Sequence, residues 1–302
     1  MQTPPQNVVV TGGSGKAGRA VVKELLAHGH RALNVDLVAP LDPADALCHF
    51  LKADLNDMGQ AVDALRRATG TVERRRPFEL ADAVVHLAGI PAPGLAPDAT
   101  TFQHNLMSTY NVFSAATLLG VKRVVWASSE TLFGLPFTRE TPAFAPITED
   151  HPSLPENGYA LAKGLCEEMA RQMHRWNPGT SFLGLRISNI IEAHEYPMFA
   201  AWQNDPKLRQ WNLWSYIDSR DVGLACRLGV EAAFSGAQHC IVAAADTVMA
   251  RPSAELMAHA FPGTRLTRAL GEFETLQCNA RAHQLIGYAP RYSWRSGQRA
   301  GT

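Results

Sequence analysis

Short aliphatic runs alternate with segments of helical periodicity along the first two thirds of the chain. Residues 7–10 form a β-branched run that predicts a strand, and residues 19–27 place valine and leucine at the spacing of an amphipathic helix. Residues 31–36 predict a second strand. The same alternation continues in predicted helices at 58–68, 102–119 and 159–176 and in predicted strands at 83–87, 121–127 and 181–186.

Strands that alternate with helices pair in parallel through right-handed crossovers, which predicts a Rossmann-type doubly wound parallel sheet of the α/β class. We assign this dinucleotide-binding domain to residues 1–187, completed by about residues 218–245. Residues 188–217 are rich in tryptophan, proline and asparagine, and residues 246–302 contain short mixed elements. We expect them to form a small C-terminal substrate lobe over the carboxyl edge of the sheet, where open α/β folds bind ligands.

The composition is that of an ordinary globular enzyme, with 302 residues of which 46% are hydrophobic and 19% charged. The formal net charge is zero, so we expect no nucleic acid or other polyanion as a partner. The dense basic run at residues 74–76 is typical of a solvated loop.

The five cysteines are scattered, and no CxxC pair occurs. We therefore predict neither a disulfide framework nor a metal site, and the cysteine usage favours a reducing compartment. The first residues lack the pattern of a signal peptide, and no window approaches the length of a membrane span. The expectation is a cytoplasmic protein with no membrane partner.

A glycine-rich segment at residues 11–18 lies between the first predicted strand and helix, as a dinucleotide fold requires. Gly12 permits the tight turn, Gly15 lets the backbone approach a pyrophosphate, and Gly18 allows close helix–strand packing. Amides at the helix N-terminus, including those of Lys16 and Ala17, are expected to face the phosphates.

Asp36 ends the second predicted strand, 18 residues beyond Gly18. A carboxylate at this place accepts hydrogen bonds from the ribose hydroxyls of a dinucleotide. Leu37 and Val38 follow it where a basic residue would favour a 2′-phosphate. The segment therefore predicts NAD rather than NADP as the cofactor.

Tyr159 and Lys163 lie four residues apart on a predicted helix, so their side chains share one face. A tyrosine is a poor base near neutral pH, but a nearby ammonium and a positive nicotinamide ring favour the phenolate. The pair Ser128-Ser129 follows the predicted strand at 121–127, where Ser129 can orient a substrate hydroxyl. These residues predict a proton-transfer site.

Together these features resemble the extended short-chain dehydrogenase/reductase family, which includes nucleotide-sugar epimerases and dehydratases. The resemblance rests on the glycine-rich loop, Asp36, Asp54-Leu55, His86-Leu87-Ala88-Gly89, Asn105, Ser128-Ser129, Tyr159-x-x-x-Lys163, Leu185-Arg186 and the segment at residues 216–222.

The resemblance implies a role for each matching residue. Asp54 and Leu55 are expected to flank the adenine, and Leu87, Ala88 and Gly89 to line the adenosine and pyrophosphate. Asn105 is expected to support the cofactor side, Tyr159 to exchange the proton, and Lys163 also to bond the nicotinamide ribose. Members of the family often dimerise through two helices, which implies a homodimer through residues 102–119 and 159–176.

The reaction is less constrained than the fold. In dehydratases of the family two acidic residues follow the catalytic hydroxyl, whereas here Glu130 is followed by Thr131, so dehydration is disfavoured. We interpret Glu130 as a surface or supporting residue. The substrate is expected to contact Ser129, Thr131, Asn189 and Arg209. Arg209, Lys207 and Arg220 are the basic candidates in the second lobe for binding the phosphates of a nucleotide sugar.

The chain also resembles short uronate dehydrogenases in its length and in the phrase Tyr196-x-Met198-x-x-x-Trp202. In those enzymes an arginine within this phrase binds the substrate carboxylate, and here Pro197 takes its place. A uronate substrate is therefore in doubt, and a simple sugar dehydrogenase remains open.

The sequence favours an NAD-dependent oxidoreductase that acts on a hydroxyl of a small carbohydrate-like substrate, with Tyr159, Lys163 and Ser129 as catalytic residues. A nucleotide-sugar 4-epimerase with tightly bound NAD is the alternative, and an NAD-binding sensor without activity is a third hypothesis. The sugar itself is left open.

Overall fold

The computed structural model describes residues 4–66 and 80–297, and its central feature is a parallel sheet. Within these residues seven strands form the sheet, in the order β10 (Ala237–Val242), β7 (Ser181–Ile187), β5 (Arg123–Ser129), β4 (Ala83–His86), β1 (Asn7–Thr11), β2 (Arg31–Asp36) and β3 (His49–Lys52). Every pairing is parallel. The predicted Rossmann-type α/β fold is confirmed.

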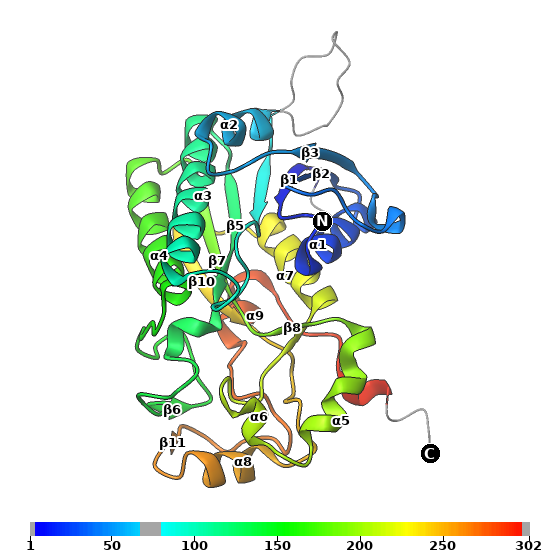
Figure 1. The fold of residues 1–302 in the computed structure, drawn as a ribbon. Helices are drawn as coiled ribbons and strands as arrows, with labels where there is room; N and C mark the ends of the chain where they lie inside the picture. Colours follow the sequence, from blue (N-terminus) through cyan, green and yellow to red (C-terminus); the bar gives the residue numbers. More distant parts are fainter. Residues whose placement is uncertain (1–3, 67–79, 298–302) are drawn as a thin grey trace.

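Helices cover both faces of the sheet (Figure 1). One face is packed by α2 (Met58–Arg66), α3 (Asp98–Leu118) and α4 (Gly158–Trp176). The other face is packed by α1 (Lys16–Ala27), α7 (Ser219–Glu231) and α9 (Ala280–Ile286). From β1 the chain builds the sheet outward to β2 and β3 on one side, and from β4 it builds outward on the other side. The boundary between β1 and β4 is the topological switch point where such folds bind ligands.

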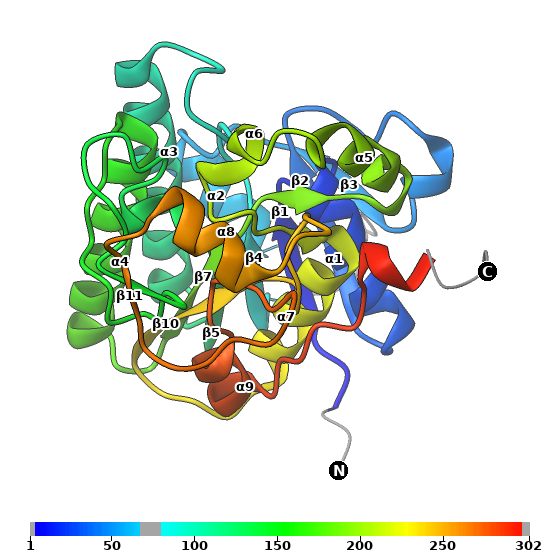
Figure 2. The same ribbon diagram turned by 90° about the horizontal axis from the view of Figure 1, so that it is seen from below.

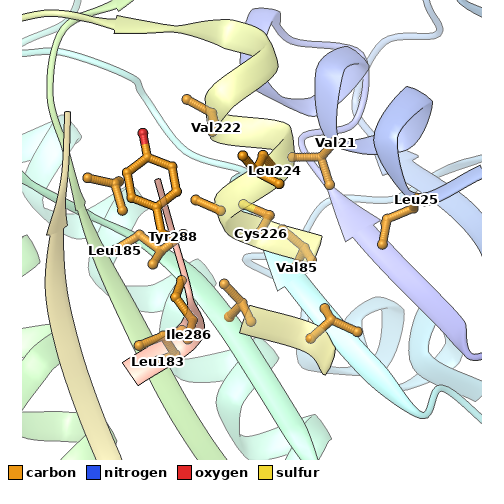
Figure 3. Packing of buried hydrophobic residues seen from close by; sticks show 14 of the residues in the cluster. Val21, Leu25, Val85, Leu183, Leu185, Val222, Leu224, Cys226, Ile286 and Tyr288 are labelled. Carbon is orange, nitrogen blue, oxygen red and sulfur yellow. The ribbon is translucent and has the colours of Figure 1, made fainter. Parts of the chain in front are cut away.

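The core beneath α1 and α7 is aliphatic and tightly packed (Figure 3). Val21 of α1 and Val222 of α7 are fully buried over the sheet residue Val85, and each such side chain contributes about 1.5–3 kcal/mol by leaving water. The two helices approach closely because Gly223 has no side chain: a Cβ there would lie 2.8 Å from the carbonyl oxygen of Ala20.

A smaller lobe lies beyond the carboxyl ends of the strands. Figure 2 shows the molecule from below, with this lobe toward the viewer. Its elements are β6 (Phe144–Ala145), β8 (Ile190–Ile191), β9 (Ile217–Asp218), β11 (Arg265–Leu266), α5 (Phe199–Trp202), α6 (Lys207–Gln210), α8 (Ser253–Ala260) and the 3-10 helices η2 (Glu130–Phe133), η3 (Ala193–Met198) and η4 (Trp294–Gly297). Phe199, Trp214 and Tyr216 are central to its buried cluster.

The lobe and the sheet domain exchange segments near the predicted boundaries. Phe133 and Ile147, which we assigned to the dinucleotide domain, pack in the cluster of the smaller lobe. In contrast, α9 and Tyr288 pack on the sheet cluster although they lie within residues 246–302. The chain therefore crosses between the two bodies more often than its alternation of elements suggests.

Several elements differ from the sequence expectation. Helix α3, for example, begins at Asp98, four residues before the predicted start at residue 102. Strand β3 was not predicted, because it is an edge strand whose side chains are mostly exposed and carry no apolar run. Helix α1 begins at Lys16, three residues earlier than predicted, because the helix starts inside the glycine-rich segment. The basic run at residues 74–76 lies outside the described residues. Among the residues described, no helix is long and apolar enough to cross a membrane.

Candidate active site

A pocket of about 1110 Å³ opens at the carboxyl edge of the sheet. Its walls come from the loops that follow six strands, β1, β2, β3, β4, β5 and β7, together with the N-terminal turns of α1 and α4. It therefore spans the switch point between β1 and β4. Most of the predicted site residues line it; Asn105 and Arg209 do not.

The glycine-rich loop forms one wall, and its glycines are required by close backbone contacts. Gly12 has φ of +70°, and a Cβ there would lie 2.7 Å from the backbone nitrogen of Ala88. At Gly18 a Cβ would lie 2.1 Å from the carbonyl oxygen of Gly12. Gly15 caps α1 without a side chain, and the first turn of that helix contains no acidic residue. The amides of this turn thus form an anion-binding end.

Asp36 lies at the end of β2 beside this loop, where it lines the pocket. Its carboxylate accepts hydrogen bonds from the backbone nitrogens of Ser14 at 3.1 Å and Leu37 at 2.7 Å. A carboxylate has about four acceptor positions, so about two remain for ribose hydroxyls. Arg19, the arginine of α1, forms a salt bridge with Asp45, with 2.9 Å between the guanidinium and the carboxylate.

Another wall of the pocket contains the other residues that were predicted to contact the adenosine and the pyrophosphate. Asp54 and Leu55 line it after β3, and Leu87–Gly89 line it after β4. Asn105 lies behind this wall: its side chain accepts a hydrogen bond from the nitrogen of Ile90 at 2.8 Å and donates one to the oxygen of Ile90 at 2.9 Å. Asn105 therefore holds the loop in place, and the residues present fit a dinucleotide.

The catalytic residues predicted from the sequence meet in the same pocket. Lys163 is buried on α4, donates a hydrogen bond to the carbonyl oxygen of Ala127 at 2.7 Å, and lies 5.6 Å from the ring centre of Tyr159. Ser129 accepts hydrogen bonds from both the nitrogen and the hydroxyl of Thr131, at 3.1 and 2.9 Å. Because Thr131 occupies both acceptor positions of Ser129, the proton of the serine is directed elsewhere.

Burial has the largest effect on the pKa values of Tyr159 and Lys163. It raises the pKa of Tyr159 to about 12, while a hydrogen bond from Ser129 lowers that pKa and the charge of Glu130 raises it. Burial also lowers the pKa of Lys163 below its ordinary value. The side chains around Tyr159 therefore favour the neutral phenol, since burial outweighs the neighbouring ammonium. The expected phenolate relied on this ammonium together with a positive nicotinamide ring.

Glu130 is buried, so of our two interpretations, a surface or a supporting residue, the structure agrees with the second. Its carboxylate accepts hydrogen bonds from Ser188 at 2.7 Å, from Asn212 at 3.2 Å and from Gln277. Burial raises the pKa of the Glu130 carboxyl. The residue thus connects the turn that carries Ser129 to three segments of the chain far from it in sequence.

The second lobe contributes neutral polar groups to the pocket. Asn189 lines it, and the oxygen of its side chain accepts a hydrogen bond from Arg209 at 3.0 Å. Arg209 is buried between the rings of Trp202 and Trp211, 4.6 and 5.0 Å from their centres. Of the other basic candidates, Arg220 pairs with Asp218, with 2.8 Å between the charged groups, and Lys207 is exposed.

Sequence reasoning missed several residues of the pocket wall, including Ser188, Ile190 and Trp211. A signal was present for Ser188: it directly follows a buried strand of the sheet, at the same edge where Ser129 ends its strand and where ligands bind. Trp211 lies in an irregular segment whose position depends on tertiary packing.

Comparison with known proteins agrees with this geometry. Residues 8–201 match the NAD dependent epimerase/dehydratase family. A bifunctional UDP-glucose 4-epimerase and UDP-xylose 4-epimerase of Arabidopsis thaliana is 29% identical over 229 residues, which are 74% of this chain and 63% of that protein. The match therefore covers less than two thirds of the relative's length.

Solved structures share the fold. A short-chain dehydrogenase/reductase superfamily protein from Agrobacterium tumefaciens with bound NAD has a TM-score of 0.69 at 22% identity, covering 97% of this chain and 95% of that chain. A uronate dehydrogenase from Agrobacterium tumefaciens has a TM-score of 0.64 at 20% identity, covering 97% and 87%. With its matched residues and its pocket, the chain belongs to the NAD-dependent epimerase/dehydratase family, the extended branch of the short-chain dehydrogenases/reductases.

Proposed function

We propose that this protein is an NAD-dependent dehydrogenase that oxidises a hydroxyl group of a small, uncharged carbohydrate. Tyr159 takes the hydroxyl proton, Ser129 orients the reacting oxygen, and Lys163 stabilises the phenolate and the cofactor ribose. When bound, NAD⁺ supplies the hydride acceptor and a positive charge next to the tyrosine. The substrate loses one hydride and one proton, so each turnover forms one carbonyl group and one NADH.

The hydroxyl of Ser129 has one proton to donate, because Thr131 donates to its oxygen. That proton can bond Tyr159 or, when a substrate is bound, the reacting oxygen. With a pKa near 12, Tyr159 holds its proton firmly and is well suited to return it to a carbonyl oxygen. Oxidation requires the opposite transfer, so it is expected to be faster at alkaline pH.

The position of Arg209 supports a free sugar over a nucleotide sugar. A diphosphate carries about two charges that are costly to bury without cationic partners. Arg209 was the candidate partner, but it is enclosed by two indole rings and bonded to Asn189 and to the oxygen of Ser215. The polar groups that the second lobe presents to the pocket, Ser188 and Asn189, are instead neutral and suit the recognition of hydroxyl groups.

A nucleotide-sugar 4-epimerase with retained NAD is the second candidate. It is favoured by the relatives: the proteins of Arabidopsis thaliana and Bacillus subtilis that match this chain, at 29% and 31% identity, are named UDP-glucose 4-epimerases. A substrate screen that follows NADH absorbance, combined with calorimetry of UDP binding, separates the two. NADH formation with a free sugar and no UDP binding supports the dehydrogenase; tight UDP binding with no net NADH contradicts it.

We also propose that two subunits associate through α3 and α4. These helices pack together and expose Met107, Tyr110, Leu161 and Leu165 on the outer surface. Apolar side chains gathered on one face favour burial against a second copy. Light scattering is expected to give twice the mass of the chain, and Leu165→Glu to reduce it to that of a monomer; a monomeric wild type contradicts this arrangement.

A further inference from the structure

Two glutamates of the second lobe reach across to the helix that carries the glycine-rich loop. Glu195 pairs with Lys16, with 2.6 Å between the carboxylate and the ammonium. Glu192 pairs with Arg19 at 3.0 Å. Lys16 also donates to the carbonyl oxygen of Ile190 at 3.4 Å. We refer to Lys16, Arg19, Glu192 and Glu195 as the clasp.

Each side of the clasp is also held by contacts within its own lobe. Glu192 and Glu195 form a capping box at the start of η3, in which the side chain of Glu195 accepts a hydrogen bond from the nitrogen of Glu192 at 2.7 Å. Lys16 and Arg19 are three residues apart on α1 and so share one face. Arg19 is further held by Asp45 at 2.9 Å.

The clasp borders the pocket at its glycine-rich end. Lys16 and Ile190 both line the pocket, one from each lobe. Lys16 belongs to the first helical turn, whose amides form the anion-binding end. At its other end, η3 is fixed to the second lobe, because Tyr196 donates a hydrogen bond to Asp218 and packs against Phe199. The segment therefore forms a strap that joins the second lobe to the glycine-rich rim of the pocket.

We propose that the clasp gates exchange of the dinucleotide, with Glu192 and Glu195 as the residues that keep the strap closed. This inference rests on the binding of NAD in this pocket and deepens the proposed function, because a dehydrogenase has to exchange its cofactor in every turnover. A gate that closes over both the free and the occupied pocket slows entry and release alike. It changes rates and leaves the affinity nearly unchanged.

The size of the effect follows from the exposure of the pairs. The side chains of Lys16 and Glu195 are 35% and 24% exposed, so each pair is worth about 0.2–1 kcal/mol. Loss of both pairs is therefore expected to accelerate entry and release of the dinucleotide by about 2- to 30-fold. Screening by salt is expected to accelerate the wild type in the same direction.

The test compares the wild type with the double variant Glu192→Gln, Glu195→Gln. NADH binding and release are followed by stopped-flow fluorescence, with excess NAD⁺ as the trap, and the Kd is measured by titration. Glu168→Gln is the control, because Glu168 forms an exposed pair with Arg171 on α4, away from the pocket. We expect both rates to rise in the double variant, the Kd to change by less than about twofold, and the control to match the wild type.

Three results overturn the proposal. Unchanged rates mean that the strap does not limit exchange. Slower release means that Glu195 only competes with phosphate for Lys16. A Kd that rises by the same factor as the release rate means that the glutamates contribute affinity and form no gate. If the wild type itself binds no NADH, the cofactor assignment fails and the clasp with it, whereas NADH binding with unchanged rates refutes the clasp alone.

Discussion

Replacement of Asp36 by alanine is the sharpest test of the cofactor half of the pocket. The carboxylate is fixed by the backbone nitrogens of Ser14 and Leu37, which leaves about two of its acceptor positions for ribose hydroxyls. A hydrogen bond to a charged group contributes about 1.5–3 kcal/mol. Asp36→Ala is therefore expected to weaken NAD binding by about 12- to 160-fold.

The same change acts in the opposite direction on NADP. In the wild type the carboxylate repels a 2′-phosphate, and alanine removes that repulsion, so the preference for NAD over NADP is expected to shrink. Asp42→Ala is the matched control. Asp42 lies after the same strand and accepts a local hydrogen bond from Ala44 at 2.8 Å, but it does not line the pocket.

Isothermal titration calorimetry with NAD⁺ and NADP⁺ on the three proteins measures these effects. The two backbone nitrogens released in Asp36→Ala lie at the partly exposed edge of the sheet, so the melting temperature is expected to change little. Equal affinity of the wild type for NAD⁺ and NADP⁺, or an Asp36→Ala variant that binds NAD⁺ as the wild type does, would refute the reasoning.

Three further predictions concern the chemistry. Lys163→Met removes a charge 5.6 Å from the centre of the Tyr159 ring. At an effective dielectric constant of about 20 this charge stabilises the phenolate by about 3 kcal/mol. Turnover is therefore expected to fall about 100-fold in steady-state assays, and a loss below tenfold contradicts this. Glu130→Gln removes a charge that raises the pKa of Tyr159, so the alkaline rise of kcat/KM for oxidation is expected to shift to lower pH, and a shift to higher pH would exclude this role. Arg209→Lys cannot hold Asn189 as the guanidinium does, so the KM of the sugar is expected to rise by about two- to tenfold with NADH affinity unchanged; weakened NADH binding would show a wider structural role.

The parts of the site that follow from local sequence were predictable. The glycine spacing specifies the turn because a Cβ at Gly12 or Gly18 meets backbone atoms. Tyr159 and Lys163 share a helix face by spacing alone, and Ser129 follows an apolar strand whose end has to lie at the ligand edge. In each case the geometry is determined by a few neighbouring residues.

The parts that depend on distant contacts were not predictable. Glu130 is buried because Ser188, Asn212 and Gln277 converge on it from three separate segments, and no local pattern marks that convergence. The strand β3 escaped because edge strands with exposed side chains lack an apolar run.

Arg209 shows the same limit from the other side. Its residue type and lobe suggested a phosphate ligand, but two tryptophans enclose it, seven residues before it and two residues after it. Both lie at the ends of one-turn helices, whose relative position is set by packing. The direction of a long side chain in such a segment is decided by tertiary packing, so sequence alone does not specify it.

The most direct test of the central claim is the amount of NADH formed per molecule of sugar consumed, measured for the wild type and for Tyr159→Phe. The phenylalanine keeps the ring and removes the transferable proton, so its turnover is expected to fall by at least about 100-fold while NADH affinity stays unchanged. For the wild type we predict one NADH for each sugar oxidised. Conversion of a UDP-sugar to its epimer without net NADH, or a Tyr159→Phe variant that turns over as the wild type does, would contradict the account.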